Sequence, residues 1–155
     1  MDMRKQTERH FNVHLEHVDR FQFRSQASEG ERLHGEPILS DEPDPVGDAS
    51  AQATPALLAT ALAHCLSASL LETMRHARVD VRSLVTDATA VVALGPEGHP
   101  RIRQVDVVIQ PQVPANSDRL DRCAEVFEKH CTVTASVRDG VQINVKVDWN
   151  LVPTE

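Results

Sequence analysis

The sequence is poor in aromatic residues and cysteine, and it lacks a long apolar run. Aromatic residues make up 3% of the 155 positions and tyrosine is absent, so a buried core must rest on leucine, valine, isoleucine and alanine. No stretch approaches the roughly 18–20 uninterrupted apolar residues of a membrane span. Residues 1–6 include basic side chains, but no apolar segment follows them, which is unlike a signal peptide. We therefore expect a cytoplasmic protein.

The net charge of the protein and the spacing of its possible metal ligands argue against several classes of binding partner. The formal net charge of −7 argues against nucleic acid or an anionic membrane surface as a partner. The histidines and cysteines do not show the short paired spacing of structural zinc sites, and there is no glycine-rich phosphate loop. We thus expect neither a metal nor a cofactor. The length predicts a single domain over 1–155, with residues 1–10 as a flexible extension.

The first forty residues are predicted to form strands. Apolar and polar residues alternate over 11–15 and 21–23, which predicts two strands joined by a hairpin turn at 17–20. Residues 25–36 are polar and carry no pattern, and 38–39 favour a short third strand. The acidic stretch that follows, 41–48, contains two prolines, and its composition favours a solvated surface loop.

A long helix is predicted over 54–77. Thr54 is a suitable N-cap and Pro55 suits the first helical position. The segment is apolar on almost every side as far as Leu71, which indicates a buried central helix rather than a surface helix. One sheet and one short helix hardly cover such a helix, so we expect a homodimer that encloses the central helices of both chains.

The remaining elements complete an α+β fold. Two strands, 88–94 and 102–109, flank a turn rich in glycine and proline. Asp118 is expected to cap a helix over 119–129, a short helix follows Cys131, and clean alternation over 141–149 predicts a last strand. Because the strands come in hairpins, the sheet is expected to be mostly antiparallel.

The cysteines are the candidates for chemistry. A thiol becomes useful in peroxide chemistry when its pKa falls and a resolving thiol is within reach. Cys65 on the long helix is either such a thiol or a small apolar core residue. Cys131 starts a short helix, whose dipole is expected to lower the pKa of its thiol. Cys123 shares a stripe with Leu120 and Phe127 and is interpreted as core packing, with a Cys123–Cys131 pair as the alternative.

Three pieces of sequence follow one another in a characteristic order: Asp-Glu-Pro-Asp-Pro-Val-Gly at 41–47, the helix segment 55–65, and Cys-Thr-Val at 131–133. Together they resemble the OsmC/Ohr family of osmotically inducible and organic-hydroperoxide-resistance proteins. The similarity extends from about residue 11 to residue 149. It implies an intertwined homodimer in which antiparallel sheets flank two central helices. It also implies a two-cysteine thiol peroxidase that reduces organic hydroperoxides and is regenerated by small or lipoyl-type dithiols.

By position, Cys65 matches the peroxidatic cysteine of the family and Cys131 the resolving cysteine. Arg20 is the best match to the arginine that activates the thiol, with Arg24 second. Two features depart from the family: residues 53–57 lack the glutamate that usually holds this arginine, and 48–52 lack the usual glycines. The alternative is therefore an OsmC-fold protein with little peroxidase activity that binds a small hydrophobic ligand at the dimer interface.

Overall fold

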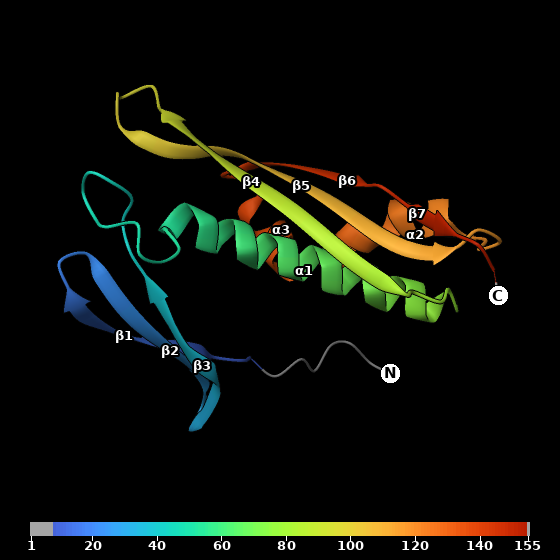
Figure 1. The fold of residues 1–155 in the computed structure, drawn as a ribbon, viewed down its shortest axis with the longest axis horizontal. Coiled ribbons are helices and arrows are strands. Elements are labelled where there is room, and N and C mark those ends of the chain that lie inside the picture. Colours follow the sequence, from blue (N-terminus) through green and yellow to red (C-terminus); the bar gives the residue numbers. More distant parts are fainter. Residues whose placement is uncertain (1–7, 155) are drawn as a thin grey trace. The chain divides into compact units, whose positions relative to one another are not determined.

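The computed structural model describes residues 8–154, which form two compact units that meet in sequence at Thr54 and Pro55 (Figure 1). Most of the predicted extension, residues 1–7, lies outside the described residues. Residues 8–10 precede the first strand without regular structure.

The first unit is a three-stranded antiparallel sheet in the order β1-β2-β3 (Figure 1). Its strands are β1 (Phe11–Asp19), β2 (Gln22–Glu29) and β3 (Arg32–Ser40). The predicted hairpin is present, but its turn lies at Arg20 and Phe21 instead of 17–20. The expectation that 25–36 lacks regular structure was wrong. These strands carry polar residues on both faces, so they give no period-two hydrophobic signal.

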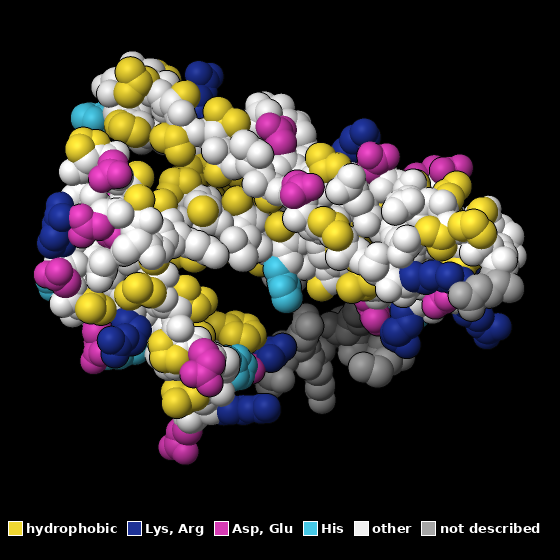
Figure 2. Space-filling view, in the orientation of Figure 1, with side chains coloured by type: hydrophobic (Ala, Val, Ile, Leu, Met, Phe, Trp, Pro, Cys, Tyr) yellow, Lys and Arg dark blue, Asp and Glu magenta, His cyan; other side chains and the backbone are white. Residues whose placement is uncertain are grey.

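One face of this sheet carries a group of apolar residues on β1 and β3 that are open to solvent. The register places Leu15 beside Ser25, and Ser25 beside Ile38, and alternation along β1 adds Phe11 and Val13 to the same face. The four apolar residues of this group are 54–65% exposed in the single chain. Exposed apolar side chains are visible across the molecular surface in Figure 2. An apolar face of this kind usually marks a protein contact.

The second unit packs helices against a mixed sheet (Figure 1). Its elements are α1 (Thr54–His76), β4 (Ser83–Leu94), β5 (Pro100–Pro114), α2 (Leu120–Val126), the 3-10 helix η2 (Phe127–His130), α3 (Thr132–Val137), β6 (Gln142–Val147) and β7 (Asn150–Val152). The hairpin of β4 and β5 is antiparallel, as predicted, whereas β6 and β7 pair with β5 in parallel. The parallel pairing arises because the chain crosses over through α2, η2 and α3 before β6.

The core of this unit is built on one stripe of α1. Leu62, Leu66, Leu70 and Met74 follow one another at intervals of four residues and are fully buried, which places them on one helix face. They belong to a single cluster with β5 and the short helices. The expectation of a helix buried on every side is not met within one chain, because Leu71 on the same helix is 42% exposed.

Helix α1 is long and apolar enough to cross a membrane by length and composition, with a mean hydropathy of 1.5 over 18 residues. The core helix of a soluble protein meets the same criterion. Because its buried stripe packs with the sheet and the short helices, we interpret α1 as a core helix.

The helix after β5 begins differently from the prediction. Its N-cap is Arg119, in the left-handed conformation with φ of 63°, and no side chain caps the helix. The prediction that Asp118 is the cap was therefore wrong. The expected stripe is present, since Cys123 and Phe127 are buried. Burial raises the pKa of the Cys123 thiol, and the charge of Arg119 opposes this only in part.

Candidate functional site

Two thiols from distant parts of the sequence meet in the core of the second unit. Cys65 lies on α1, half-buried against the core, and Cys131 is fully buried between η2 and α3. The Cys65 side chain is among the neighbours that raise the pKa of the Cys131 thiol, so the two side chains lie close together. Both are free thiols, as is Cys123. Two neighbouring thiols can condense to a disulfide once one of them is oxidised.

Cys131 is held by the helix that follows it. It is the N-cap of α3, and its thiol donates to Thr134 Oγ1 at 2.9 Å, while the Thr134 backbone N–H donates to Cys131 Sγ at 3.4 Å. Burial raises the pKa of Cys131 and Cys65 raises it further, whereas the two hydrogen bonds with Thr134 lower it. The expected lowered pKa was therefore wrong, because loss of water around the thiolate outweighs the stabilisation at the helix start.

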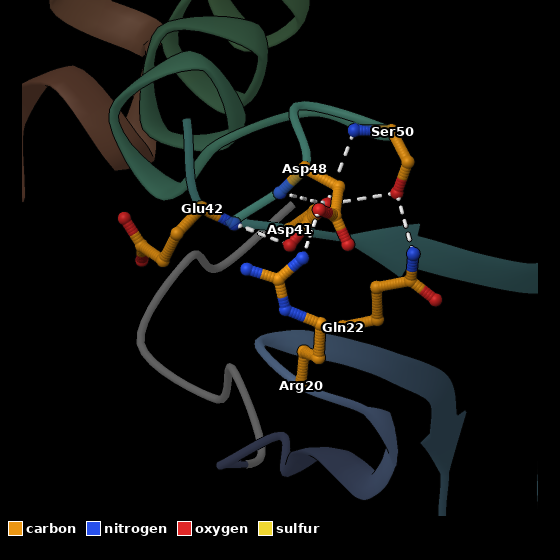
Figure 3. A network of polar contacts seen from close by, with 6 residues as sticks. All are labelled: Arg20, Gln22, Asp41, Glu42, Asp48 and Ser50. Atoms are coloured by element: carbon orange, nitrogen blue, oxygen red, sulfur yellow. Dashed lines mark hydrogen bonds and ion pairs between the residues drawn. The ribbon is translucent and has the colours of Figure 1, made fainter. Parts of the chain in front are cut away.

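Arg20 lies in the turn between β1 and β2, with φ of 46°. Its guanidinium forms an ion pair with Asp48, as Figure 3 shows. The arginine thus has a carboxylate partner, although the start of α1 supplies none. Sequence reasoning missed Asp48, whose signal was its place in the stretch that replaces the family's glycines. Arg24, the alternative, is exposed on β2, and the relation of either arginine to Cys65 stays a prediction.

The loop that carries Asp48 is ordered around a buried carboxylate. Asp41 is 3% exposed and accepts hydrogen bonds from the backbone N–H groups of Glu42, Asp48 and Ser50 at 2.8, 3.2 and 3.1 Å. The Ser50 hydroxyl adds a fourth at 2.8 Å (Figure 3). These bonds, the one from the Ser50 backbone first, lower the pKa of Asp41. Most residues of 41–48 are exposed, as expected of a surface loop, but Asp41 and Gly47 are buried, and the network around Asp41 fixes the backbone that presents Asp48.

Glycine is required inside this loop. A Cβ atom on Gly47 would lie 2.1 Å from the backbone oxygen of Glu42 and 2.6 Å from Asp41 Oδ1. Such contacts cannot be relieved without moving the backbone or the buried carboxylate. Gly47 therefore allows the chain to fold closely around Asp41.

Changing Asp41 to asparagine is expected to lower the melting temperature near pH 7. The NH₂ group of the asparagine would replace a carboxylate oxygen that now accepts hydrogen bonds, so it would face the N–H donors of the loop without an acceptor between them. Because the pKa of Asp41 is lower in the folded protein than in the unfolded chain, its carboxylate contributes its full stabilisation above the unfolded-state pKa. This stabilisation is lost as the pH falls through the folded-state pKa. The difference from wild type should therefore shrink below about pH 4. Thermal melts across pH test this, with Asp44→Asn, an exposed carboxylate of the same loop, as the control. Equal melts for the two variants at every pH would contradict the structural role.

Within residues 8–154, no group of three histidine, cysteine, aspartate or glutamate side chains is placed to hold a metal ion. The second unit holds the two neighbouring thiols Cys65 and Cys131, and the first unit, taken by itself, holds the ion pair of Arg20 and Asp48. Such groups are suited to thiol redox chemistry.

Comparison with solved structures identifies the fold. A protein from Psychrobacter arcticus, named for osmotic stress induction and detoxification response, is 21% identical with a TM-score of 0.69, covering 88% of this chain and 94% of its own. An OsmC-like protein from Mycoplasma pneumoniae is 16% identical, with a TM-score of 0.68 and coverage of 95% and 99%. An organic hydroperoxide resistance protein from Elizabethkingia anophelis is 14% identical, with a TM-score of 0.67 and coverage of 94% and 99%.

The sequence comparisons agree with the fold. No curated protein matches this chain. The family model described as OsmC-like protein matches residues 47–146, which is more than half of the sequence and includes both Cys65 and Cys131. The resemblance in the sequence is thereby confirmed, and the chain belongs to the OsmC family.

Proposed function

We propose that this chain is a two-cysteine thiol peroxidase that reduces organic hydroperoxides. The observation that carries the proposal is a pair of reduced cysteines in one core: Cys131 is buried in it, and Cys65 packs against it close enough to raise the pKa of the Cys131 thiol. The family and the similarity in fold to a protein named for organic hydroperoxide resistance support the same activity. The coarser conclusion, membership in a family that includes hydroperoxide resistance proteins, does not depend on this proposal.

The proposed cycle has three steps. The Cys65 thiolate attacks the O–O bond of the hydroperoxide and takes one oxygen, so that Cys65 becomes a sulfenic acid and the alcohol leaves. The Cys131 sulfur then attacks the sulfenic sulfur, forming the disulfide as the S–O bond breaks and water leaves. A dithiol reductant, of the lipoyl type in our proposal, exchanges with the disulfide, restores both thiols and is itself oxidised to a disulfide.

Arg20 supplies the positive charge in this proposal. It would favour the thiolate of Cys65 and orient the peroxide, because a cation beside a thiol stabilises its charged form. The missing glutamate at the start of α1 argued for a binding protein without turnover. The ion pair between Arg20 and Asp48 weakens that argument, because a carboxylate from the loop holds the arginine instead.

We propose a homodimer as the active assembly. The apolar face of the β1-β2-β3 sheet, with Phe11, Val13 and Leu15 more than half exposed, is expected to be covered by a second copy, since an exposed apolar patch marks a contact. All 155 residues would act as one OsmC-like domain in each copy. We propose a cytoplasmic location, with neither nucleic acid nor a membrane as a partner.

The proposed function predicts a specific product of oxidation. After one equivalent of cumene hydroperoxide, thiol titration should show the loss of two thiols per chain. Intact mass should fall by about 2 Da, since two hydrogens leave as the disulfide forms, and peptide mapping should place the bond between Cys65 and Cys131. Unchanged thiols, or stepwise oxidation to sulfinic acid without a disulfide, would contradict the peroxidase and favour binding of a small hydrophobic ligand.

A further inference from the structure

Thr134 contacts the Cys131 sulfur with two of its groups. Its Oγ1 atom lies 2.9 Å from Cys131 Sγ, and its backbone N–H donates to the same sulfur at 3.4 Å. Thr134 is 1% exposed and Cys131 is fully buried. The two groups of Thr134 therefore stand where water would solvate an exposed thiol.

The second step of the proposed cycle places a demand on this buried thiol. Cys131 must lose its proton to attack the Cys65 sulfenic acid, and burial opposes the charge that results. Cys65, acting from α1, opposes it too, and the neighbouring residues Lys129 and His130 are exposed. The Thr134 hydroxyl accepts from the neutral thiol and, after rotating about its C–O bond, can donate to the thiolate.

We propose that Thr134 is a positioning residue for disulfide formation, holding the Cys131 sulfur in place and stabilising its thiolate through the hydroxyl. The inference rests on the proposed peroxidase function. In this step the S–H bond of Cys131 and the S–O bond of the Cys65 sulfenic acid break, and the S–S bond forms. The proton of Cys131 leaves with the hydroxide as water, so Thr134 undergoes no net change.

Substitution at Thr134 separates the two steps of the cycle. In Thr134→Val, Cys65 should be oxidised by cumene hydroperoxide at the wild-type rate, but the disulfide should form about tenfold more slowly or worse, as expected on losing one hydrogen bond to a charged group. The sulfenic acid should accumulate as a dimedone adduct, and the pH profile of disulfide formation should move to higher pH. Thr134→Ser, which keeps the hydroxyl, should restore both. Thr132→Val makes the same change at an exposed position of α3 and serves as the matched control.

Wild-type rates and an unshifted pH profile in Thr134→Val would overturn the inference. If Thr134→Val does not fold, Thr134→Ala carries the same test. Titration of the Cys131 thiolate by ultraviolet absorbance, in a background of Cys65→Ala and Cys123→Ala, judges Thr134 without peroxide. A higher pKa of Cys131 in Thr134→Val supports the inference, and an equal pKa overturns it, even if the wild-type protein forms no disulfide and the proposed function fails.

Discussion

Replacing Cys65 with serine is expected to reduce hydroperoxide turnover by about 10³-fold or more, because the attacking sulfur is lost and a serine hydroxyl is a far weaker acid and nucleophile than a thiol. Serine is close to cysteine in size, so the helix stripe of Leu62, Leu66 and Leu70 should keep its packing. Turnover is measured as consumption of cumene hydroperoxide in the presence of dihydrolipoamide. Circular dichroism shows whether the fold is retained.

Cys123→Ala is the matched control for this prediction. Cys123 is also a buried thiol in the same core, but its pKa responds to burial and Arg119 and not to the other cysteines. Its removal should leave turnover within a few-fold of wild type. If Cys65→Ser retained turnover while a folded Cys123→Ala lost it, the reactive thiol would be Cys123 and the assigned pair would be wrong.

The long helix and the hairpins could be predicted because their signals are local. The N-cap residue Thr54 and the following Pro55 predict the start of α1, which begins at Thr54. The helix ends at His76, one residue before the predicted end at Ala77. The β4–β5 hairpin follows from its turn residues in the same way. By contrast, β2 and β3 carry polar side chains on both faces, so most of their length gives no alternating pattern from which a strand could be predicted. The parallel pairing of β6 with β5 depends on the position of β6 after the crossover through α2, η2 and α3, which no local pattern specifies.

In the candidate site, too, the features that depend on local sequence could be predicted and those that depend on the folded structure could not. Cys65 and Cys131 are separated by several elements, so the residues alone could not place them together, and the family resemblance supplied the pairing. The direction of the Cys131 pKa could not be predicted either, since it depends on burial that only the folded core creates. The role of Asp41 was hidden for a related reason. Its carboxylate resembles its solvated acidic neighbours in sequence and differs from them only in the N–H groups that the loop directs toward it.

The assignment of the activating arginine leads to the second large prediction. In the proposed function, Arg20→Met should slow the oxidation of Cys65 by about 100-fold, the typical cost of removing one donor that stabilises developing charge at a reactive centre. Arg24→Met, the same change on the exposed second candidate, should have little effect. The rate of sulfenic acid formation with cumene hydroperoxide, trapped with dimedone under single turnover, measures this first step apart from disulfide formation.

Asp48→Asn shows whether the ion pair of Arg20 matters for this step. Losing the carboxylate that pairs with Arg20 should leave the guanidinium charge in place but free to move, so the rate should fall less than in Arg20→Met. This order, in which Arg20→Met is slowest, Asp48→Asn is intermediate and Arg24→Met is near wild type, follows only if Arg20 acts on the thiol and Asp48 positions Arg20. A slow Arg24→Met beside an unaffected Arg20→Met would transfer the role to Arg24. Asp48 would then be a structural residue of the loop, because its partner would lie outside the chemistry.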